Sequence, residues 1–126
     1  MSEGYYGWKN FETYNCNLWY GNMHNYAQEV FNDIVKTNHP CNFYIFKPNI
    51  NDFMEMVKIL FVNHLAECIE RMIEDEKRKI FQNEFTFLRD LVNKSIRSID
   101  FREVASHYWE SIDQSEIESI FANEAE

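Results

Sequence analysis

Residues 53–73 read FMEMVKILFVNHLAECIERMI, and this stretch decides the fold. Its apolar side chains recur every three or four residues over about six turns, which is the pattern of a helix with one buried face. They are Phe53, Met56, Val57, Leu60, Phe61, Leu65, Cys68, Ile69, Met72 and Ile73. The stretch therefore predicts a long core helix, with Asn49 or Asn51 as its cap.

The opposite face of this helix is predicted to carry its charges. Glu67 lies four residues before Arg71, and Glu74 lies four before Arg78, a spacing at which opposite charges support each other on a helix. His64 falls on the apolar stripe instead. We therefore expect His64 to be a hydrogen-bonded core histidine.

Shorter helices are predicted before the long one. One begins near Phe11, with Asn10 or Thr13 as its cap, and breaks near Gly21. A second continues to about Lys36. The apolar run at residues 43–46, between two prolines, is interpreted as an extended connector, although a short buried strand has the same pattern.

Further helices are predicted after the long one. A weak break at residues 82–83 is followed by a helix that ends near Ser95, whose apolar pattern is Phe81, Phe85, Leu88 and Val92. Asp100 and Asp113 each begin an acid-x-x-Glu pattern typical of a capping box. The expected fold is all-α, a single compact bundle of five or six helices around one long central helix. Residues 1–126 are expected to form one domain.

Composition limits the class of protein. The chain has 126 residues, of which 45% are hydrophobic and 17% aromatic, with three glycines and two prolines, so a packed core is expected rather than disorder. It has no long apolar run and no signal-peptide pattern, which favours a soluble cytoplasmic protein without a membrane segment. Three cysteines without a Cys-x-x-Cys pair indicate reduced thiols.

The net charge of −9 is concentrated at one end of the sequence. Residues 103–126 contain seven acidic residues and no lysine or arginine, whereas residues 67–102 are balanced. Nucleic-acid binding requires basic side chains for the phosphates, so direct nucleic-acid binding is not expected. The candidate partner-binding residues are Glu110, Asp113, Glu116, Glu118 and Glu124. A purely solvated acidic face is the alternative.

Catalytic and metal sites have little support in the sequence. His39 and Cys41 are the closest histidine–cysteine pair, but a structural zinc site needs a second pair of ligands. Glu103 and His107 are one helical turn apart and could exchange a proton, yet Glu103 also fits a capping role. No catalytic residue, metal or cofactor is therefore predicted.

The aromatic amino-terminal region suggests another site. Trp8, Tyr14 and Trp19 could line a pocket for a small ligand or nucleotide derivative. The alternative is an aromatic core whose polar atoms bond to Thr13 and Asn15, linking the first helix to the long helix. A structural oligomer is a third possibility.

Two motifs carry a family resemblance. Residues 10–15 read NFETYN and are followed by Leu18-Trp19, and residues 99–108 read IDFREVASHY. They resemble the opening and closing motifs of a family of small proteins of unknown function, common in tailed-phage genomes. The match covers about a fifth of the chain and leaves out residues 43–48 and the long helix.

The resemblance implies a phage or mobile-element protein made inside a bacterial cell, without an established reaction. Such proteins often act by occupying host machinery, and some inhibitors imitate DNA with acidic side chains. We therefore expect an accessory protein that binds a host or host-defence protein with a basic surface, as an anti-CRISPR-like inhibitor would. The acidic helices after Asp100 are its expected binding surface.

Overall fold

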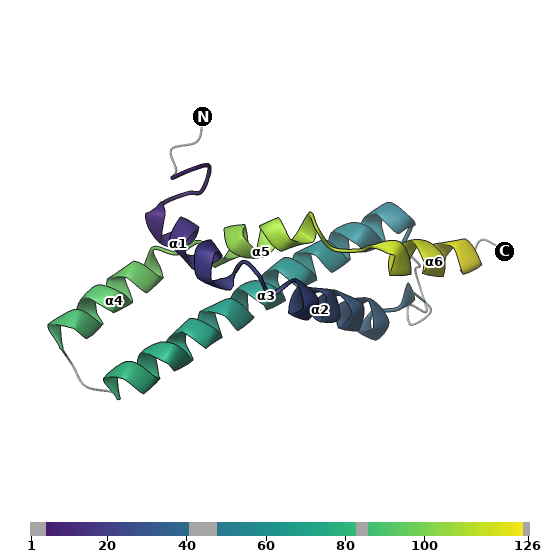
Figure 1. Cartoon of the computed structure of the whole chain (residues 1–126). Helices are drawn as coiled ribbons and strands as arrows, with labels where there is room; N and C mark the ends of the chain where they lie inside the picture. The colour runs from purple at the N-terminus through teal and green to yellow at the C-terminus, as the bar shows by residue number, and fades with distance from the viewer. Residues whose placement is uncertain (1–4, 41–47, 83–85, 125–126) are drawn as a thin grey trace.

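The computed structural model describes residues 5–40, 48–82 and 86–124, and this part of the chain contains six helices and no strand (Figure 1). The helices are α1 (Phe11–Tyr20), α2 (His24–Thr37), α3 (Ile50–Phe81), α4 (Phe87–Arg97), α5 (Phe101–Trp109) and α6 (Ser115–Glu124). The predicted all-α bundle around one long central helix is confirmed. None of the described helices has both the length and the apolar composition needed to cross a bilayer.

Helix α3 has 32 residues, begins after Asn49, one of the two predicted caps, and ends at the predicted break, so it extends beyond the six-turn apolar stripe. The side chain of Asn49 accepts a hydrogen bond from the N–H of Asp52 at 2.8 Å, which caps the first turn. Gln82 ends the helix with φ 49°, and its N–H donates to the carbonyl of Arg78. This left-handed residue stops the helix by turning the backbone out of its path.

The start of α4 differs from the sequence-based expectation. The predicted helix included Phe85, which lies outside the described residues, whereas α4 begins at Phe87. The hydroxyl of Thr86 accepts the N–H of Arg89 at 3.0 Å and so caps the first turn. Cys41 and the apolar run at residues 43–46 also lie outside the described part of the chain.

One face of α3 forms the centre of the core. Phe53, Val57, Phe61, Leu65 and Ile69 follow one another at intervals of four residues and are fully buried. They pack with residues of three other helices: Ala27, Phe31 and Val35 of α2, Val104, Ala105 and Tyr108 of α5, and Ile117 of α6. Each large apolar side chain contributes about 1.5–3 kcal/mol when fully buried, so this core is the main stabilising element.

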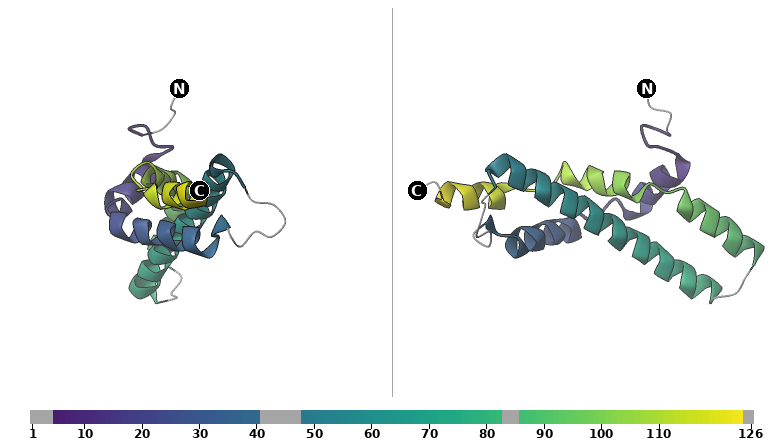
Figure 2. Two further views of the ribbon diagram at one scale, coloured as in Figure 1. Left: turned by 90° about the vertical axis from the view of Figure 1, so that its right-hand side faces the viewer. Right: turned by 180° about the vertical axis from the view of Figure 1, so that it is seen from behind.

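The molecule is elongated, with different helices at its two ends. Helices α2, α5 and α6 surround the amino-terminal half of α3, while α4 runs beside the carboxy-terminal half (Figures 1 and 2). Helix α1 lies between these regions and packs on α5. As a result, α4 and α6 occupy opposite ends of the molecule.

Helix α1 is more exposed than its aromatic composition suggests. Its buried residues are Thr13 and Cys16, which face α5 and the core, so the rest of this short helix remains at the surface. The exposed side chains are Phe11, Asn15, Leu18 and Trp19. The expectation that Asn15 is an internal hydrogen-bonding partner is therefore wrong.

The surface ion pairs of α3 also differ from the prediction. Within the described chain, Glu67 and Glu74 are not paired with the basic residues four positions further on. Instead, Lys77 Nζ lies 2.7 Å from Glu74, and Arg78 lies 3.0 Å from Asp75. Both pairs use the i, i+3 spacing, which also places side chains on the same helix face.

Candidate functional site

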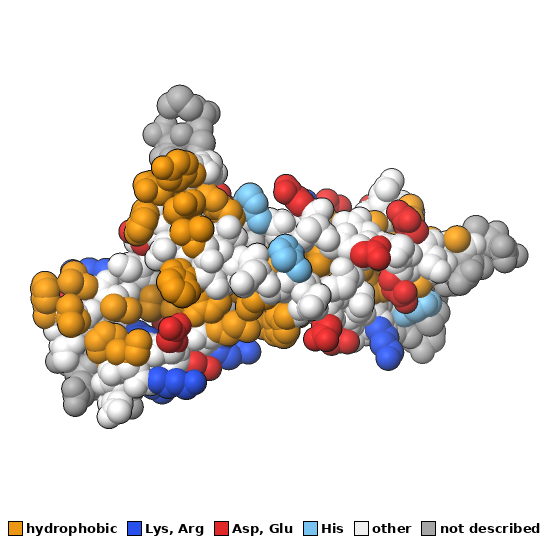
Figure 3. All heavy atoms as spheres, in the orientation of Figure 1, with side chains coloured by type: hydrophobic (Ala, Val, Ile, Leu, Met, Phe, Trp, Pro, Cys, Tyr) orange, Lys and Arg blue, Asp and Glu red, His pale blue; other side chains and the backbone are white. Residues whose placement is uncertain are grey.

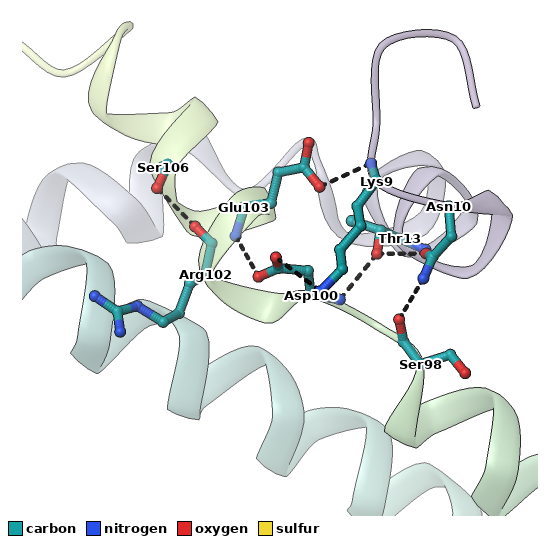
Figure 4. Close-up of polar contacts among 8 residues, drawn as sticks. All are labelled: Lys9, Asn10, Thr13, Ser98, Asp100, Arg102, Glu103 and Ser106. Atoms are coloured by element: carbon teal, nitrogen blue, oxygen red, sulfur yellow. Dashed lines mark hydrogen bonds and ion pairs between the residues drawn. The ribbon is translucent and has the colours of Figure 1, made fainter. Parts of the chain in front are cut away.

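Thr13 joins α1 to the segment that precedes α5 (Figure 4). Its buried hydroxyl donates to Asn10 Oδ1 at 2.7 Å and accepts the backbone N–H of Asp100 at 2.8 Å. Asn10 Nδ2 in turn donates to the carbonyl of Ser98 at 2.7 Å. Because buried polar groups are costly without partners, these bonds favour a single position of α1 against this segment.

Glu103 adds contacts from α5 itself. As predicted for a capping box, Asp100 Oδ1 accepts the N–H of Glu103 at 3.1 Å. The N–H of Asp100 is used by Thr13, however, and Glu103 Oε1 accepts the N–H of Lys9 at 3.0 Å (Figure 4). We call Lys9, Asn10, Thr13, Ser98, Asp100 and Glu103 the α1–α5 lock.

Aromatic contacts extend the lock along α5. The ring of Trp8 is buried and stacks on His107, with centroids 4.0 Å apart. The hydroxyl of Tyr108 donates to the carbonyl of Tyr20 and accepts the N–H of Met23 at 3.0 Å. The motifs at residues 10–15 and 99–108 thus meet in a structural junction. This junction joins α1 to α5, rather than to the long helix as expected.

The predicted aromatic pocket is not assembled. Trp8 packs on His107, whereas Tyr14 lies beside the rings of Tyr5 and Tyr6, at 5.0 and 5.3 Å between centroids. Trp19 is five residues beyond Tyr14, which places it on a different face of α1. The structure therefore does not bring the three predicted residues to one cavity.

A different apolar cavity lies between α1, α3 and α4. This α1–α4 groove has a volume of about 750 Å³. The apolar residues that line it include Phe11, Trp19, Ile73, Leu88, Leu91 and Ile99. The sequence shows these apolar positions, but not which of them remain uncovered when the chain folds.

Two ionisable groups that line the groove, Tyr20 and Cys16, have raised pKa values. Tyr20 donates its hydroxyl proton to Glu76 at 2.6 Å, and burial together with this bond raises the pKa of Tyr20 to about 12. Burial raises the pKa of the Cys16 thiol to about 11. Neither the Cys16 thiol nor the Tyr20 hydroxyl is therefore ionised near neutral pH, and the lining of the groove is mainly apolar.

The predicted acidic residues lie at the opposite end of the molecule. Glu110 follows the last residue of α5, Asp113 lies in the link, and Glu116 and Glu118 are in the first turn of α6. All four side chains are exposed, and we call them the acidic end. Figure 3 shows acidic side chains toward this end of the visible face. The side chain of Glu124 lies outside the described part of the chain.

Asp113 also has a structural role within the acidic end. Its backbone N–H donates to Gln28 Oε1 at 3.0 Å, and its carbonyl accepts from Gln28 Nε2 at 3.1 Å, which ties the link to α2. Its carboxylate accepts the backbone N–H of Ser115 at 3.0 Å. Hydrogen bonds from the backbone and then the side chain of Ser115 lower the pKa of Asp113.

The histidines differ from expectation where the structure describes them, whereas the pair His39 and Cys41 is not tested because Cys41 lies outside the described residues. His64 is exposed, rather than a core residue, and its Nε2 lies 3.6 Å from the thiol of Cys68. Tyr26 donates to the same thiol at 3.3 Å, and this bond raises the pKa of Tyr26. Within the described residues, no group of three or more histidines, cysteines and acids is arranged to hold a metal ion.

Glu103 and His107, considered above as an acid–base pair but not predicted to be catalytic, are not joined by a hydrogen bond among the described residues. Glu103 binds the backbone of Lys9, and His107 stacks on Trp8. Both side chains therefore serve the junction between α1 and α5.

Comparison of the chain with protein-family models, curated proteins and solved structures found no match. Its function is therefore inferred from its own residues and their arrangement.

Proposed function

We propose that this protein acts by binding, as a phage-type accessory protein whose acidic end engages a basic surface of a host or host-defence protein. The observation that carries the proposal is the exposure of four carboxylates at this end, contributed by the α5–α6 link and both flanking helices. In the described chain, no ion pair neutralises any of them. They remain available to basic groups of a partner.

Some acidic residues elsewhere in the described chain form ion pairs, whereas others, such as Glu55 and Glu67, are exposed without one. Asp90 is paired with Lys94 at 3.5 Å, and the acidic residues at 74 and 75 are each paired within α3. Residues 103–126 contain no lysine or arginine with which the acidic end could form such pairs. The acidic end therefore differs from α3, where acidic and basic side chains are interspersed, and this one-sided charge supports a role in intermolecular recognition.

Charge complementarity also suggests the class of partner. An acidic surface attracts a basic groove over a distance of about 10 Å at moderate salt, which accelerates encounter more than it increases affinity. Basic grooves are typical of proteins that bind nucleic acid. The proposed partner is therefore a nucleic-acid-binding protein whose groove the acidic end occupies. The phage context of this proposal rests on the motif resemblance.

The proposal is tested with variants that have equal net charge. Glu116→Gln/Glu118→Gln neutralises two carboxylates of the acidic end, and Glu55→Gln/Glu67→Gln neutralises two exposed carboxylates of α3. The tagged parent chain is used to capture host proteins at low salt, and the captured protein is identified and eluted with increasing salt. We expect the acidic-end variant to lose this protein and the α3 variant to retain it.

Two results would overturn the proposal. One is equal retention of the captured protein by the parent chain and the acidic-end variant. The other is elution that does not depend on salt, since exposed charge pairs are screened as ionic strength rises. Both variants are compared with the parent by circular dichroism, because Glu116 and Glu118 also favour the start of α6.

A further inference from the structure

Helix α4 presents an apolar face that the rest of the described chain leaves uncovered. Phe87 is 76% exposed, Leu88 63% and Leu91 44%, whereas Ile96 is the one buried residue of this helix. At 100° per residue, Phe87, Leu88 and Leu91 share one side of α4. Figure 3 shows hydrophobic side chains gathered over α4 and α1.

The contact of α4 with α3 uses another side of the helix. Lys77 Nζ donates to Asn93 Oδ1 at 2.8 Å, and a polar cavity of about 530 Å³ next to this bond is lined by Glu70, Glu74 and Arg97. An isolated helix of 11 residues is only marginally stable in water. Ile96, Ile99 and Phe101 also line this cavity, but Ile96 is the one buried side chain of α4, so this contact provides little apolar burial for the helix.

The α1–α4 groove lies next to this uncovered face. Trp19, which is 75% exposed, forms its α1 wall, and Leu88 and Leu91 form its α4 wall. Exposed apolar surface of this kind, gathered on neighbouring helices, usually marks an interface. In each chain α4 forms one wall of the groove. Its exposed apolar face also makes it a suitable occupant for the groove of a second chain.

We propose that the occupant of the groove is α4 of a second copy of this chain, docked antiparallel in a two-fold symmetric dimer. In such an arrangement each copy inserts Phe87, Leu88 and Leu91 against the α1 wall of the other. A self-complementary surface closes after two copies, because the same patch is used on both. The proposed dimer thus covers both apolar faces at once.

The charges of α4 select the antiparallel direction. Asp90 lies in its first turn and Lys94 and Arg97 in its last, all on the flank beside Phe87. Antiparallel pairing about residue 92 places Asp90 opposite Lys94 of the other copy, and Phe87 opposite Arg97. Parallel pairing would instead bring the two basic last turns together and align the helix dipoles.

The exposed apolar area is of the size that a dimer requires. A stable interface buries about 800 Å² on each partner. Aromatic side chains can each bury about 150–250 Å², so Phe11, Trp19 and Phe87 supply roughly half of that area when their present exposure is considered. The leucines of α4 and the adjacent part of α1 supply the remainder.

This dimer is independent of the proposed partner binding. The acidic end lies at the opposite end of the molecule from α4, so both acidic ends stay free in the dimer (Figure 1). Two linked sites can raise apparent affinity through effective concentration when a partner offers two basic surfaces. Loss of the dimer would leave the carboxylates of each acidic end unchanged.

The dimer is tested by measuring the mass of the full chain with light scattering over a wide range of concentration. We expect the parent to have the mass of two chains, and Leu88→Glu/Leu91→Glu to have the mass of one. The matched control is Ile59→Glu, because Ile59 is 53% exposed on α3 but does not line the groove. Circular dichroism checks that each variant retains its helices.

Three results of the mass measurement would overturn the proposal. They are a parent chain that is monomeric at every concentration, a Leu88→Glu/Leu91→Glu variant that remains dimeric, and an Ile59→Glu variant that dissociates as well. A monomeric parent whose melting temperature rises when an amphipathic helical peptide is added would assign the groove to another protein.

The direction of pairing is tested with single cysteines and a short bismaleimide cross-linker. In the antiparallel dimer Leu91→Cys lies near the two-fold axis and should cross-link, whereas the two Phe87→Cys positions are about 15 Å apart along the helices and should not. Parallel pairing would allow both to react, and so would contradict the proposal. The parent chain, treated in the same way, controls for the native cysteines.

Discussion

The hydroxyl of Thr13 makes one bond within its own helix turn and one across 87 residues of sequence. Its position in an N-terminal helix turn could be predicted, because Asn10 and Thr13 both have capping side chains. The distant bond could not, since it depends on how the α4–α5 link approaches α1. Two motifs that lie far apart in a sequence do not by themselves show that their residues are in contact in the fold.

Thr13→Val tests the energetic role of this hydroxyl. The substitution keeps the side-chain shape but leaves the N–H of Asp100 without its partner, so we expect the free energy of unfolding to fall by about 1–3 kcal/mol. Urea unfolding measures the change, and Thr13→Ser, which retains the hydroxyl, should lose less. Equal stability of Thr13→Val and the parent would show that the α1–α5 lock is not stabilising.

Asp113 gives a prediction about acid stability. Because the bonds from Ser115 lower its pKa in the folded chain, its contribution to stability is present above the ordinary aspartate pKa of about 4 and is lost as pH falls through the lower folded value. NMR titration of this carboxyl should give a midpoint below the ordinary value. In Asp113→Asn this part of the acid sensitivity should be missing.

Glu118→Gln is the control for that experiment, since it removes one negative charge without removing the bonds from Ser115. It should keep the acid sensitivity that Asp113 provides. An Asp113 carboxyl that titrates at or above the ordinary value would contradict the assigned hydrogen bonds.

At the scale of helices, the sequence predicted α3 well and α4 less well. The apolar period and the caps at Asn49 and Gln82 determine α3, because this helix buries a continuous stripe. The period of α4 is equally clear, yet it does not tell whether Phe87, Leu88 and Leu91 face a core, solvent or a second molecule. Periodicity reveals an apolar face, but the covering of that face is a tertiary or quaternary property.

Hydrogen exchange of α4 gives a prediction at this scale. If a second copy covers α4, its backbone amides should exchange more slowly as protein concentration rises, because dimerisation suppresses local opening. The amides of α3 between Val57 and Ile69 should be insensitive to concentration, as they lie in the core of each chain. Amide hydrogen exchange of α4 and α3, measured by mass spectrometry at two protein concentrations, tests this prediction.

Protection of α4 that does not change with concentration would contradict this prediction. The variant Leu88→Glu/Leu91→Glu is the matched control, since its α4 should exchange rapidly at both concentrations.

For the whole molecule, the sequence located the acidic charge but not its distance from the apolar groove. Both α4, which forms one wall of the groove, and α6 follow α3 in the chain, and no local pattern indicates that they lie at opposite ends of the molecule. The core determines this arrangement, because α5 and α6 pack back along α3 while α4 remains beside its far end (Figure 2). The predicted aromatic pocket failed for the same reason, since the packing of α1 on α5 separates Trp8 from Trp19.

The two ends should respond to salt in opposite ways. Exposed carboxylates lose their attraction for a basic partner as ionic strength rises, whereas apolar burial is not weakened by screening. Partner binding through the acidic end should therefore decline with salt under conditions in which the dimer persists.

The most direct test of this account is the light-scattering mass of the parent chain, measured at low and at high sodium chloride. We expect the mass of two chains at both salt concentrations, because the proposed α4 interface is mainly apolar. The mass of a single chain at both concentrations would contradict the account, and so would a dimer that dissociates when the salt is raised.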